Sequence, residues 1–332
     1  MEIEKKDVFI DIKNIIELSR KKIVSSINST MTTTYFLIGK RIVEEEQGGE
    51  KRAEYGKSLI KNLSIRLTES YGKGFSERNL EQMRKFYLTY SISQTVSAEF
   101  KLSYSHYITL MRIADIEERN FYEIEAIDNG WSLRELKRQM DSALYERLVL
   151  SRDKGKVLEL SQKGQVIEKP QDIIKDPYIL EFLNLDEKAI YSENDLETGI
   201  INHIEKFIME LGKGFLFQGR QVRFTFDEEH FFVDLVFYNR LLKCFVLIDL
   251  KIGKLKHQDI GQMQMYVNYY DRHVKLADEN KTIGIIICKD KNDTLVNMTL
   301  PEGNEQIFAS RYMTILPSKE ELKKIVESEV RE

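Results

Sequence analysis

The spacing of apolar residues changes along the chain and divides the sequence in two. In the first half, apolar residues recur at the three- to four-residue spacing of amphipathic helices, over 8–27, 35–43 and 59–71. From about residue 215 they form short runs rich in aromatic and β-branched residues, which are typical of strands. The segment 151–190 is polar at its start and contains prolines, so we expect the domain boundary there.

Two helices of the first half have well-defined starts. After the turn at 72–74, Ser76 is a natural N-cap for the helix that follows. Ser132 caps a second helix, and Glu135 three residues later completes a capping box. We expect this second helix to run to about residue 150.

The second half has the element order of an α/β domain rather than that of a helix bundle. We therefore expect an α+β multidomain protein, with a helical domain over 1–165 and an α/β domain over 166–332. The elements predicted in the second domain are a helix at 193–211, strands at 215–226, 230–239 and 243–251, a helix at 256–272, strands at 281–288 and near 311–316, and a helix after Pro317.

Composition excludes several classes of protein. Hydrophobic residues make up 42% and charged residues 31% of the 332 residues, as in an ordinary globular protein. No apolar run approaches the ~20 residues that span a bilayer, and the charged N-terminus lacks the apolar run of a signal peptide. Cys244 and Cys288 lie in apolar runs, and we expect them to be reduced core residues of a cytoplasmic protein.

The net charge of −4 is the sum of two unlike parts. Residues 1–165 contain 28 basic and 25 acidic residues, a balance of +3, whereas the remainder contains 22 and 29, a balance of −7. An acidic domain can still bind DNA where metal ions and a local basic rim face the phosphates. Charge alone therefore leaves nucleic-acid binding open.

Two of the predicted strands carry acids inside apolar runs. Asp234 interrupts one run, and Asp249 and Lys251 end the next. A strand that is apolar on both faces is buried on both, where a carboxylate is costly unless it is paired or binds a metal ion. Because side chains alternate along a strand, Asp249 and Lys251 project to the same side. A hairpin turn near 239–240 would bring Asp234 beside Asp249.

Such a cluster suits metal-assisted hydrolysis. Two carboxylates and a strand carbonyl, such as that of Leu250, offer the hard oxygen ligands that Mg²⁺ prefers. Lys251 can position or deprotonate the attacking water, or stabilise charge on the phosphorus centre. The alternative, a satisfied strand acid at Asp234 and a solvated ion pair between Asp249 and Lys251, stays open on the residues alone. The chain has no Gly-rich phosphate loop with a Walker lysine, which disfavours nucleoside triphosphate hydrolysis.

The same residues resemble the PD-(D/E)XK nuclease superfamily, in which an acid precedes a hairpin and a D/E-x-K motif follows it. Here Val233 replaces the nominal proline, and Asp249 fills the D/E position. Longer segments resemble the bacterial YhcG-like family of that superfamily, so that the resemblance covers most of the chain. It implies a helical N-terminal domain followed by a restriction-endonuclease-like α/β domain with a mixed central sheet. The segments are 39–42, 55–56, 74–80, 212–221, 232–238 and 261–266.

The resemblance also assigns roles to individual residues. Asp234 and Asp249 would be metal ligands, and Lys251 would be the catalytic lysine. The superfamily uses a further acid on the helix before the first strand, for which Glu197 is the first choice. Glu205 is the alternative, because eight residues place it on roughly the same side of a continuous helix.

A second element lies on the predicted helix 256–272. Gln262 and Tyr266 resemble the Q-x-x-x-Y element of RecB-like nucleases, whose glutamine would contact DNA or metal-bound water. Gln264 is a competing choice for that role. In the alternative interpretation Tyr266 packs in the core and both glutamines face solvent.

Basic and polar residues suggest where nucleic acid would bind. Some would form a basic rim around the acidic centre, and such contacts make binding salt-dependent. Others lie on the helix that Ser76 caps, with polar donors near its start as in a recognition helix. The candidate contacts are Arg220, Arg223, Lys254, Lys256, Gln264, Arg78, Arg84 and Lys85.

The sequence thus predicts a bacterial, metal-dependent DNA endonuclease that hydrolyses phosphodiester bonds with Mg²⁺ or Mn²⁺. The N-terminal domain would target DNA or a partner. A catalytically silent DNA-binding or scaffold protein and an RNA-directed nuclease remain as alternatives. A homodimer is also considered, because cutting both strands of a duplex needs two sites.

Overall fold

The computed structural model describes most of the chain as two compact units, 1–137 and 138–332, so that the boundary expected near residue 165 falls inside the second unit. None of the helices in the described part of the chain is long and apolar enough to cross a membrane. The described residues are 8–48, 53–91, 100–150, 157–185, 191–226 and 228–315.

The first unit is helical, as predicted. The two apolar tracts at 8–27 and 35–43 belong to one long helix, and a 3₁₀ turn at Lys73–Phe75 precedes the helix that Ser76 caps. The hydroxyl of Ser76 accepts a hydrogen bond from the backbone N–H of Asn79 at 3.4 Å, which confirms the predicted cap. The helices are α1 (Val8–Gly48), α2 (Ala53–Tyr71), α3 (Glu77–Tyr90), α4 (Tyr104–Leu110), α5 (Ile116–Asp128) and α6 (Leu133–Asp141), the last of which continues into the second unit.

The core of the first unit forms where α1, α2 and α3 meet. Leu80 and Met83 of α3 are buried against Ile42 of α1 and Ile60 of α2. Gly39 of α1 permits this close approach, because a Cβ atom there would lie 2.0 Å from the backbone oxygen of Met83. The packed part of α1 is therefore its C-terminal half.

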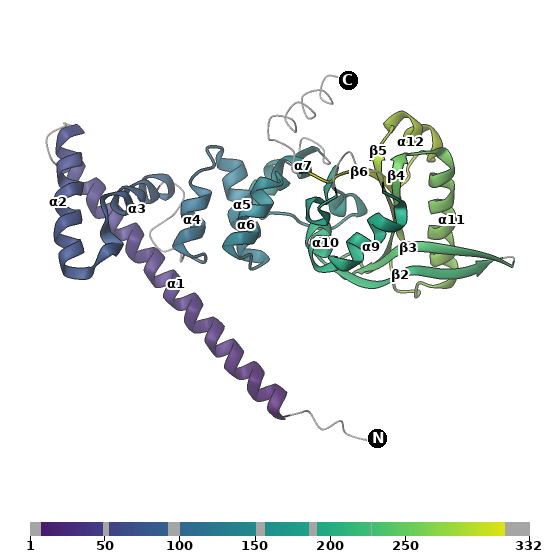
Figure 1. Cartoon of the computed structure of the whole chain (residues 1–332), viewed down its shortest axis with the longest axis horizontal. Coiled ribbons are helices and arrows are strands. Elements are labelled where there is room, and N and C mark those ends of the chain that lie inside the picture. Colours follow the sequence, from purple (N-terminus) through teal and green to yellow (C-terminus); the bar gives the residue numbers. More distant parts are fainter. Residues whose placement is uncertain are drawn as a thin grey trace. The chain divides into compact units, whose positions relative to one another are not determined.

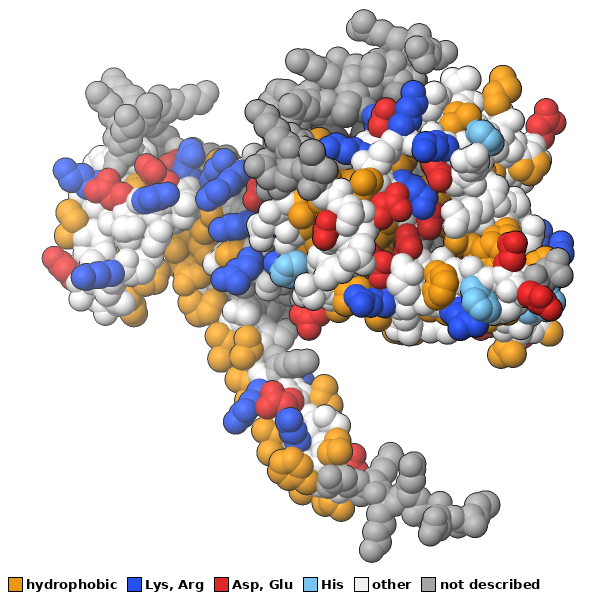
Figure 2. Space-filling view, turned by 45° about the vertical axis from the view of Figure 1, so that its right-hand side comes forward, with side chains coloured by type: hydrophobic (Ala, Val, Ile, Leu, Met, Phe, Trp, Pro, Cys, Tyr) orange, Lys and Arg blue, Asp and Glu red, His pale blue; other side chains and the backbone are white. Residues whose placement is uncertain are grey.

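The N-terminal half of α1 exposes many apolar side chains (Figure 2). They include Phe9 at 71% exposure and Leu18 at 66%. Exposed apolar faces of this extent commonly mark interaction sites. The homodimer considered above stays a prediction.

The second unit is built on a six-stranded mixed sheet with the strand order β1-β6-β5-β4-β3-β2 (Figure 1). Strands β2, β3 and β4 pair antiparallel, and β4, β5, β6 and β1 pair parallel. The elements are α7 (Leu144–Leu150), α8 (Val157–Lys163), β1 (Tyr178–Ile179), α9 (Glu193–Asn202), α10 (Ile204–Leu211), β2 (Phe215–Phe226), β3 (Glu229–Asn239), β4 (Cys244–Lys254), α11 (His257–His273), β5 (Ile283–Asp290), α12 (Asp293–Thr299) and β6 (Ile307–Met313).

The inner strands of the sheet, β4 and β5, are buried on both faces, as their apolar sequences predict, whereas the edge strand β2 is largely exposed. Leu196 and Phe207, from α9 and α10, pack with Ile248 and Ile285 on one face. Helix α11 covers the other face, where Met263 meets β5. A Cβ atom at Gly284 would lie 2.5 Å from the Met263 side chain, so glycine lets α11 lie close to the sheet.

The sequence predicted most elements of this unit correctly, but it missed two breaks. The predicted helix 193–211 is two helices, interrupted at His203, whose backbone leaves the helical region. The predicted helix from Ser132 to about residue 150 is also two helices, because Ala143 has a φ of +48°. Strand β1 and helix α12 were not predicted, and the helix predicted after Pro317 lies outside the described residues.

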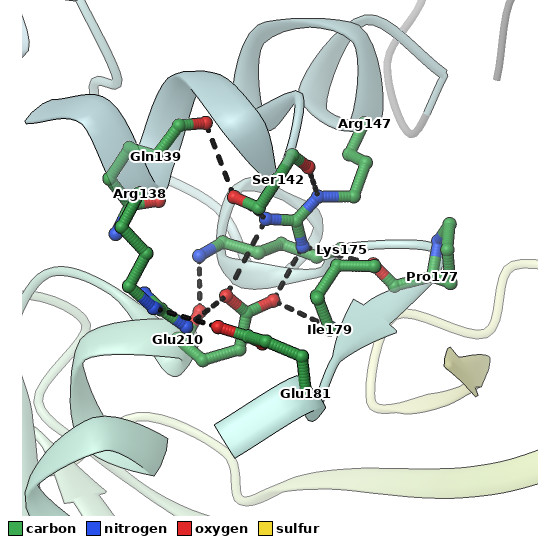
Figure 3. A network of polar contacts seen from close by, with 9 residues as sticks. All are labelled: Arg138, Gln139, Ser142, Arg147, Lys175, Pro177, Ile179, Glu181 and Glu210. Atoms are coloured by element: carbon green, nitrogen blue, oxygen red, sulfur yellow. Dashed lines mark hydrogen bonds and ion pairs between the residues drawn. The ribbon is translucent and has the colours of Figure 1, made fainter. Parts of the chain in front are cut away.

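A buried polar network joins α7, the segment around β1, and α10 (Figure 3). The fully buried carboxylate of Glu210 on α10 accepts hydrogen bonds from the guanidinium of Arg147 on α7 and from the backbone N–H of Ile179, the latter at 2.9 Å. Arg147 also donates to the carbonyl of Pro177 at 3.0 Å, and Lys175 donates to the carbonyl of Glu210. Helix α7 is thereby fixed to the sheet domain.

Removing one partner of this network should be costly. Arg147→Met leaves the buried carboxylate of Glu210 without its main partner, so we expect a loss of ~3–5 kcal/mol in the free energy of unfolding. Urea unfolding curves measure this loss.

The matched control is Lys163→Met, which removes the exposed pair between Lys163 and Glu159 in the same unit. Exposed pairs of this spacing contribute only about 0.5 kcal/mol or less. Equal losses for the two variants would contradict the structural importance of the buried pair.

Candidate active site

Strand pairing brings the predicted acids together. Strands β3 and β4 are antiparallel hairpin partners, with Leu235 opposite Ile248 and Asn239 opposite Cys244. The next position in this register places Asp234 opposite Asp249, so the predicted hairpin is confirmed. The two carboxylates lie at the point where the antiparallel part of the sheet meets its parallel part.

Asp249 is almost completely buried, at 2% exposure. Its Oδ2 atom lies 2.9 Å from the Nζ atom of Lys251. Burial and the neighbouring Asp234 carboxylate raise the pKa of Asp249 to about 7, although Lys251 opposes them. The surroundings of Asp249 therefore favour its protonated form more than water does, while the adjacent Lys251 favours its carboxylate form.

Lys251 is held in its charged form. Burial alone would lower the pKa of Lys251, but the carboxylates of Asp249 and Glu193 outweigh burial and raise the pKa above its ordinary value. The Oε2 atom of Glu193, at the start of α9, lies 3.8 Å from Nζ. In this arrangement Lys251 supplies positive charge and hydrogen-bond donors and is poorly suited to act as a base.

The carboxylate of Asp234 is oriented at both oxygens. Oδ2 accepts from the backbone N–H of Leu250 at 2.8 Å, and Oδ1 accepts from the side-chain amide of Gln221 at 3.0 Å. A carboxylate held at both ends has little freedom to rotate. Its position relative to Asp249 is therefore set by the strands.

Gln221 links two acids, and the sequence analysis did not assign it a role. Its Nε2 atom donates to Glu197 at 2.6 Å as well as to Asp234. Gln221 lies within β2 between two ladder pairs but has a φ of +46°, a conformation that is costly for a residue with a Cβ atom. Neither the strand opposite nor this backbone conformation is visible from residue spacing.

The structure separates the two candidates for the helix acid. Glu197 on α9 is 5% exposed and is linked through Gln221 to Asp234. Burial raises the pKa of Glu197 against the opposing hydrogen bond from Gln221, and the Asp234 charge adds to the rise. Glu205 lies beyond the helix break, on α10, with its side chain exposed.

The Gln262 and Tyr266 pair lies beside the acids. Tyr266 is 1% exposed, and its hydroxyl accepts a hydrogen bond from the amide of Gln262. Burial and then the Asp249 charge raise the pKa of Tyr266 to about 12. Tyr266 is thus both a core residue and a neighbour of the acids, so the two interpretations of this residue are compatible. Gln264 lies elsewhere on α11, hydrogen-bonded to Asn268 at 3.4 Å.

The donor set fits a hard divalent cation in its chemistry. Burial, and then the charge of Asp234, disfavour the ionised form of Asp249, which is the electrostatic situation that a bound cation relieves. Among the described residues, no group of three or more His, Cys, Asp and Glu side chains is arranged to hold a metal ion. In this arrangement Glu197, the third acid, is held by the amide of Gln221.

The predicted nucleic-acid contacts differ in their surroundings. Arg220 on β2 and Lys254 at the end of β4 are exposed, as is Lys256 before α11. Arg223 lies beside the ring of His230, 3.0 Å from its Nε2 atom.

In the first unit the three predicted contacts lie on α3. Arg78 and Lys85 are exposed. Arg84 forms an ion pair with Glu46 of α1 at 2.6 Å. That pair fixes α3 to α1, so a role of Arg84 in binding nucleic acid would require it to leave this partner.

Comparison with known proteins covers almost the whole chain. Residues 171–327 match the model of the YhcG PDDEXK nuclease domain, and residues 11–147 match that of the DUF1016 N-terminal domain. A protein of Escherichia coli (strain K12) named "Putative nuclease YhcG" is 41% identical over 339 residues, which cover 93% of this chain and 90% of that protein.

A solved repair endonuclease from Pyrococcus abyssi is also similar, with 16% sequence identity and a TM-score of 0.26. The similarity covers 38% of this chain and 49% of that chain. It is too slight to carry an argument about fold or function.

The raised pKa of Asp249 should make stability depend on pH. Its pKa rises from the ordinary 3.8 to about 7 in the folded protein, so the folded state holds this proton more tightly than the unfolded state. Stability should therefore fall as pH rises from about 4 to about 7 and then level off, with a total change of a few kcal/mol at ~1.4 kcal/mol per pKa unit. Urea unfolding at pH 5 and pH 8 in the presence of EDTA measures the change.

Asp249→Asn should remove most of this pH dependence, because the amide does not titrate. Glu205→Gln, which neutralises an exposed acid in the same unit, should retain the wild-type slope. An unchanged slope in Asp249→Asn would show that other groups cause the dependence.

Proposed function

The chain belongs to the YhcG family, whose members carry a PDDEXK nuclease domain, and we propose that it hydrolyses phosphodiester bonds in DNA with Mg²⁺ or Mn²⁺. The observation that carries the proposal is the acid pair beside a charged lysine. Asp234 and Asp249 lie together, and Lys251 lies 2.9 Å from Asp249. A purely structural role would not require two adjacent acids in the middle of a buried sheet.

Asp234 and Asp249, with Glu197 nearby, would hold the cation. When bound, the ion polarises the scissile phosphate and lowers the pKa of a coordinated water. Carboxylates bind a cation in their ionised form, so a bound ion would lower the raised pKa of Asp249.

Lys251 would act through its charge. Held protonated by Asp249 and Glu193, its Nζ atom can donate hydrogen bonds to the attacking water or to a phosphate oxygen. Positive charge fixed beside the reacting phosphate stabilises the negative charge that develops on it. This role needs no proton transfer by the lysine.

Gln221 would be a positioning residue. Its amide holds Glu197 and Asp234 near each other by donating to both, which offsets part of their repulsion before a cation binds. The carboxylates are thereby preorganised for binding. The strained backbone at Gln221 supports a functional reason for this side chain.

A nucleic-acid substrate, which we propose to be DNA, is supported by exposed basic residues of the nuclease unit. Arg220, Lys254 and Lys256 are exposed on the nuclease unit and can contact a phosphate backbone. Arg78 and Lys85 on α3 would allow the first unit to contribute to targeting. An RNA-directed nuclease would use the same chemistry, whereas a silent scaffold would have no need of the charged lysine beside the acids.

The decisive test is cleavage by the full chain. Plasmid, linear duplex, branched and single-stranded DNA and a structured RNA are each incubated with Mg²⁺ or Mn²⁺, and with EDTA. We expect metal-dependent cleavage of DNA, reduced at least ~10²-fold in Lys251→Ala, because one charged donor at a reacting phosphate contributes roughly that much.

Lys254→Ala is the matched control, since it removes an exposed lysine from the same strand. It should weaken DNA binding in a salt-dependent way and leave cleavage at saturating DNA nearly intact. If the wild-type protein cleaves only RNA, the substrate class changes from DNA to RNA. If it binds DNA but cleaves none of the substrates, the scaffold alternative is favoured.

Gln221→Gly separates function from stability. Glycine adopts the φ of +46° without strain, so we expect the free energy of unfolding to change by ~1 kcal/mol or less, in either direction. Cleavage should fall, and thermal stabilisation by Mg²⁺ or Ca²⁺ should require a higher ion concentration, because Glu197 and Asp234 are no longer held together.

Gln221→Asn also tolerates this backbone but is one methylene shorter, so it should not reach both acids. It should behave like the glycine variant. Wild-type cleavage and ion response in both variants would rule out a positioning role for Gln221.

A further inference from the structure

A cavity of about 350 Å³ lies between the outer part of α11 and the end of β2. We refer to it as the α11 pocket. Its volume is at the lower end of the ~300–1,000 Å³ range of small-molecule sites. The lining residues used below are Phe224, Phe226, Gln264, Asn268, Tyr269 and Arg272.

We propose that the α11 pocket binds a single nucleobase of the substrate strand. The proposal rests on the proposed nuclease function and adds a substrate feature to it, an unpaired base near the cleavage site. The argument depends on the chemistry of the pocket walls and on their distance from the acids.

The pocket has aromatic walls. The rings of Phe224 and Tyr269 are stacked, with centroids 4.1 Å apart and an angle of 21° between their planes. Phe226, at the end of β2, is 59% exposed. An exposed aromatic ring beside a stacked pair offers flat surface to a nucleobase, and stacking of this kind is tolerant of base identity.

Polar groups follow one edge of the pocket. Gln264, Asn268 and Arg272 are spaced four residues apart, so they form a row along α11. Gln264 donates to the Oδ1 atom of Asn268 at 3.4 Å, and the Oε1 atom of Gln264 and the Nδ2 atom of Asn268, which take no part in that bond, can pair with the edge of a base. The guanidinium of Arg272, at the end of the row, is exposed and can bind the phosphate of the same nucleotide.

The pocket adjoins the acid site. The ring of Phe224 forms a pocket wall and contacts Tyr266 edge-on, with centroids 5.5 Å apart. Tyr266 in turn responds to the charge of Asp249. Two neighbouring rings, Phe224 and Tyr266, therefore connect the pocket wall to the acids, so a single nucleic-acid strand is expected to reach both.

A base in this pocket cannot remain stacked in a duplex. The strand must be unpaired there, or the base must be extruded at an energetic cost that is smallest for unpaired or mismatched bases. The pocket therefore predicts a preference for DNA with single-stranded character near the cut, such as a branch, a gap or a free end.

The test measures binding of the full chain in EDTA, where no cleavage occurs. The probes are a single-stranded oligonucleotide that contains the fluorescent base 2-aminopurine and the duplex of the same sequence. We expect tighter binding of the single strand and a change in 2-aminopurine fluorescence on binding. Phe226→Ser and Asn268→Ala should each weaken single-strand binding roughly fivefold or more and leave duplex binding unchanged.

Phe232→Ser is the matched control, because Phe232 is a 45% exposed aromatic residue on the neighbouring strand and does not line the pocket. It should bind both probes as the wild type does. Both pocket residues substituted here are at the surface or on the solvent side of α11, so the variants should fold, and thermal unfolding checks this.

The outcomes separate this proposal from the nuclease function. Wild-type single-strand affinity in both pocket variants, with cleavage intact, would overturn the base pocket and leave the nuclease standing. Loss of single-strand binding in the variants, with no cleavage by the wild type, would support the base pocket in a protein that does not cut. A wild type that binds neither probe would overturn the base pocket.

Discussion

Removing a carboxylate from water costs free energy, and this cost determines how the buried acids of the second unit are arranged. Two of these acids, Glu210 and Asp249, are compensated to different degrees. Burial alone would raise the pKa of Glu210, but Arg147 and Lys175 lower it below the ordinary value, so this acid is ionised and fully compensated. Asp249 is nearly as buried, but Asp234 lies beside it and Lys251 compensates only in part, so its pKa rises. The compensated Glu210 stabilises the fold. The partly compensated Asp249 leaves a site where a bound cation can neutralise the remaining negative charge.

The compensated acid has a consequence for domain organisation. Residues 11–147 match the DUF1016 N-terminal domain, yet Arg147 at its end is buried with Glu210 in the sheet domain. The segment that matches the N-terminal domain therefore ends inside the unit that contains the sheet. Ala143, with its positive φ, ends the preceding helix and lets α7 turn into this position. A continuous helix from Ser132 could not deliver Arg147 to Glu210 along the observed path.

What the sequence could predict follows from how local each signal is. The juxtaposition of Asp234, Asp249 and Lys251 could be predicted because an acid in an apolar run is conspicuous and side chains alternate along strands. The break at His203 was missed, since the apolar periodicity continues through it. Gln221 was missed because its role depends on a pairing register and a backbone conformation, which no short-range pattern encodes.

Helix α11 shows how one element can combine core and site. Met263, Tyr266 and Tyr270 are buried, and the close packing that Gly284 permits brings the hydroxyl of Tyr266 near the acids. The same packing fixes the distance between the sheet and the outer row of α11, which consists of Gln264, Asn268 and Arg272. Because a packed helix is rigid, the spacing between this row and the acids is set by the core, not by a loop. If a DNA strand contacts both the row on α11 and the acids, the base bound by the row lies at a fixed distance from the scissile bond.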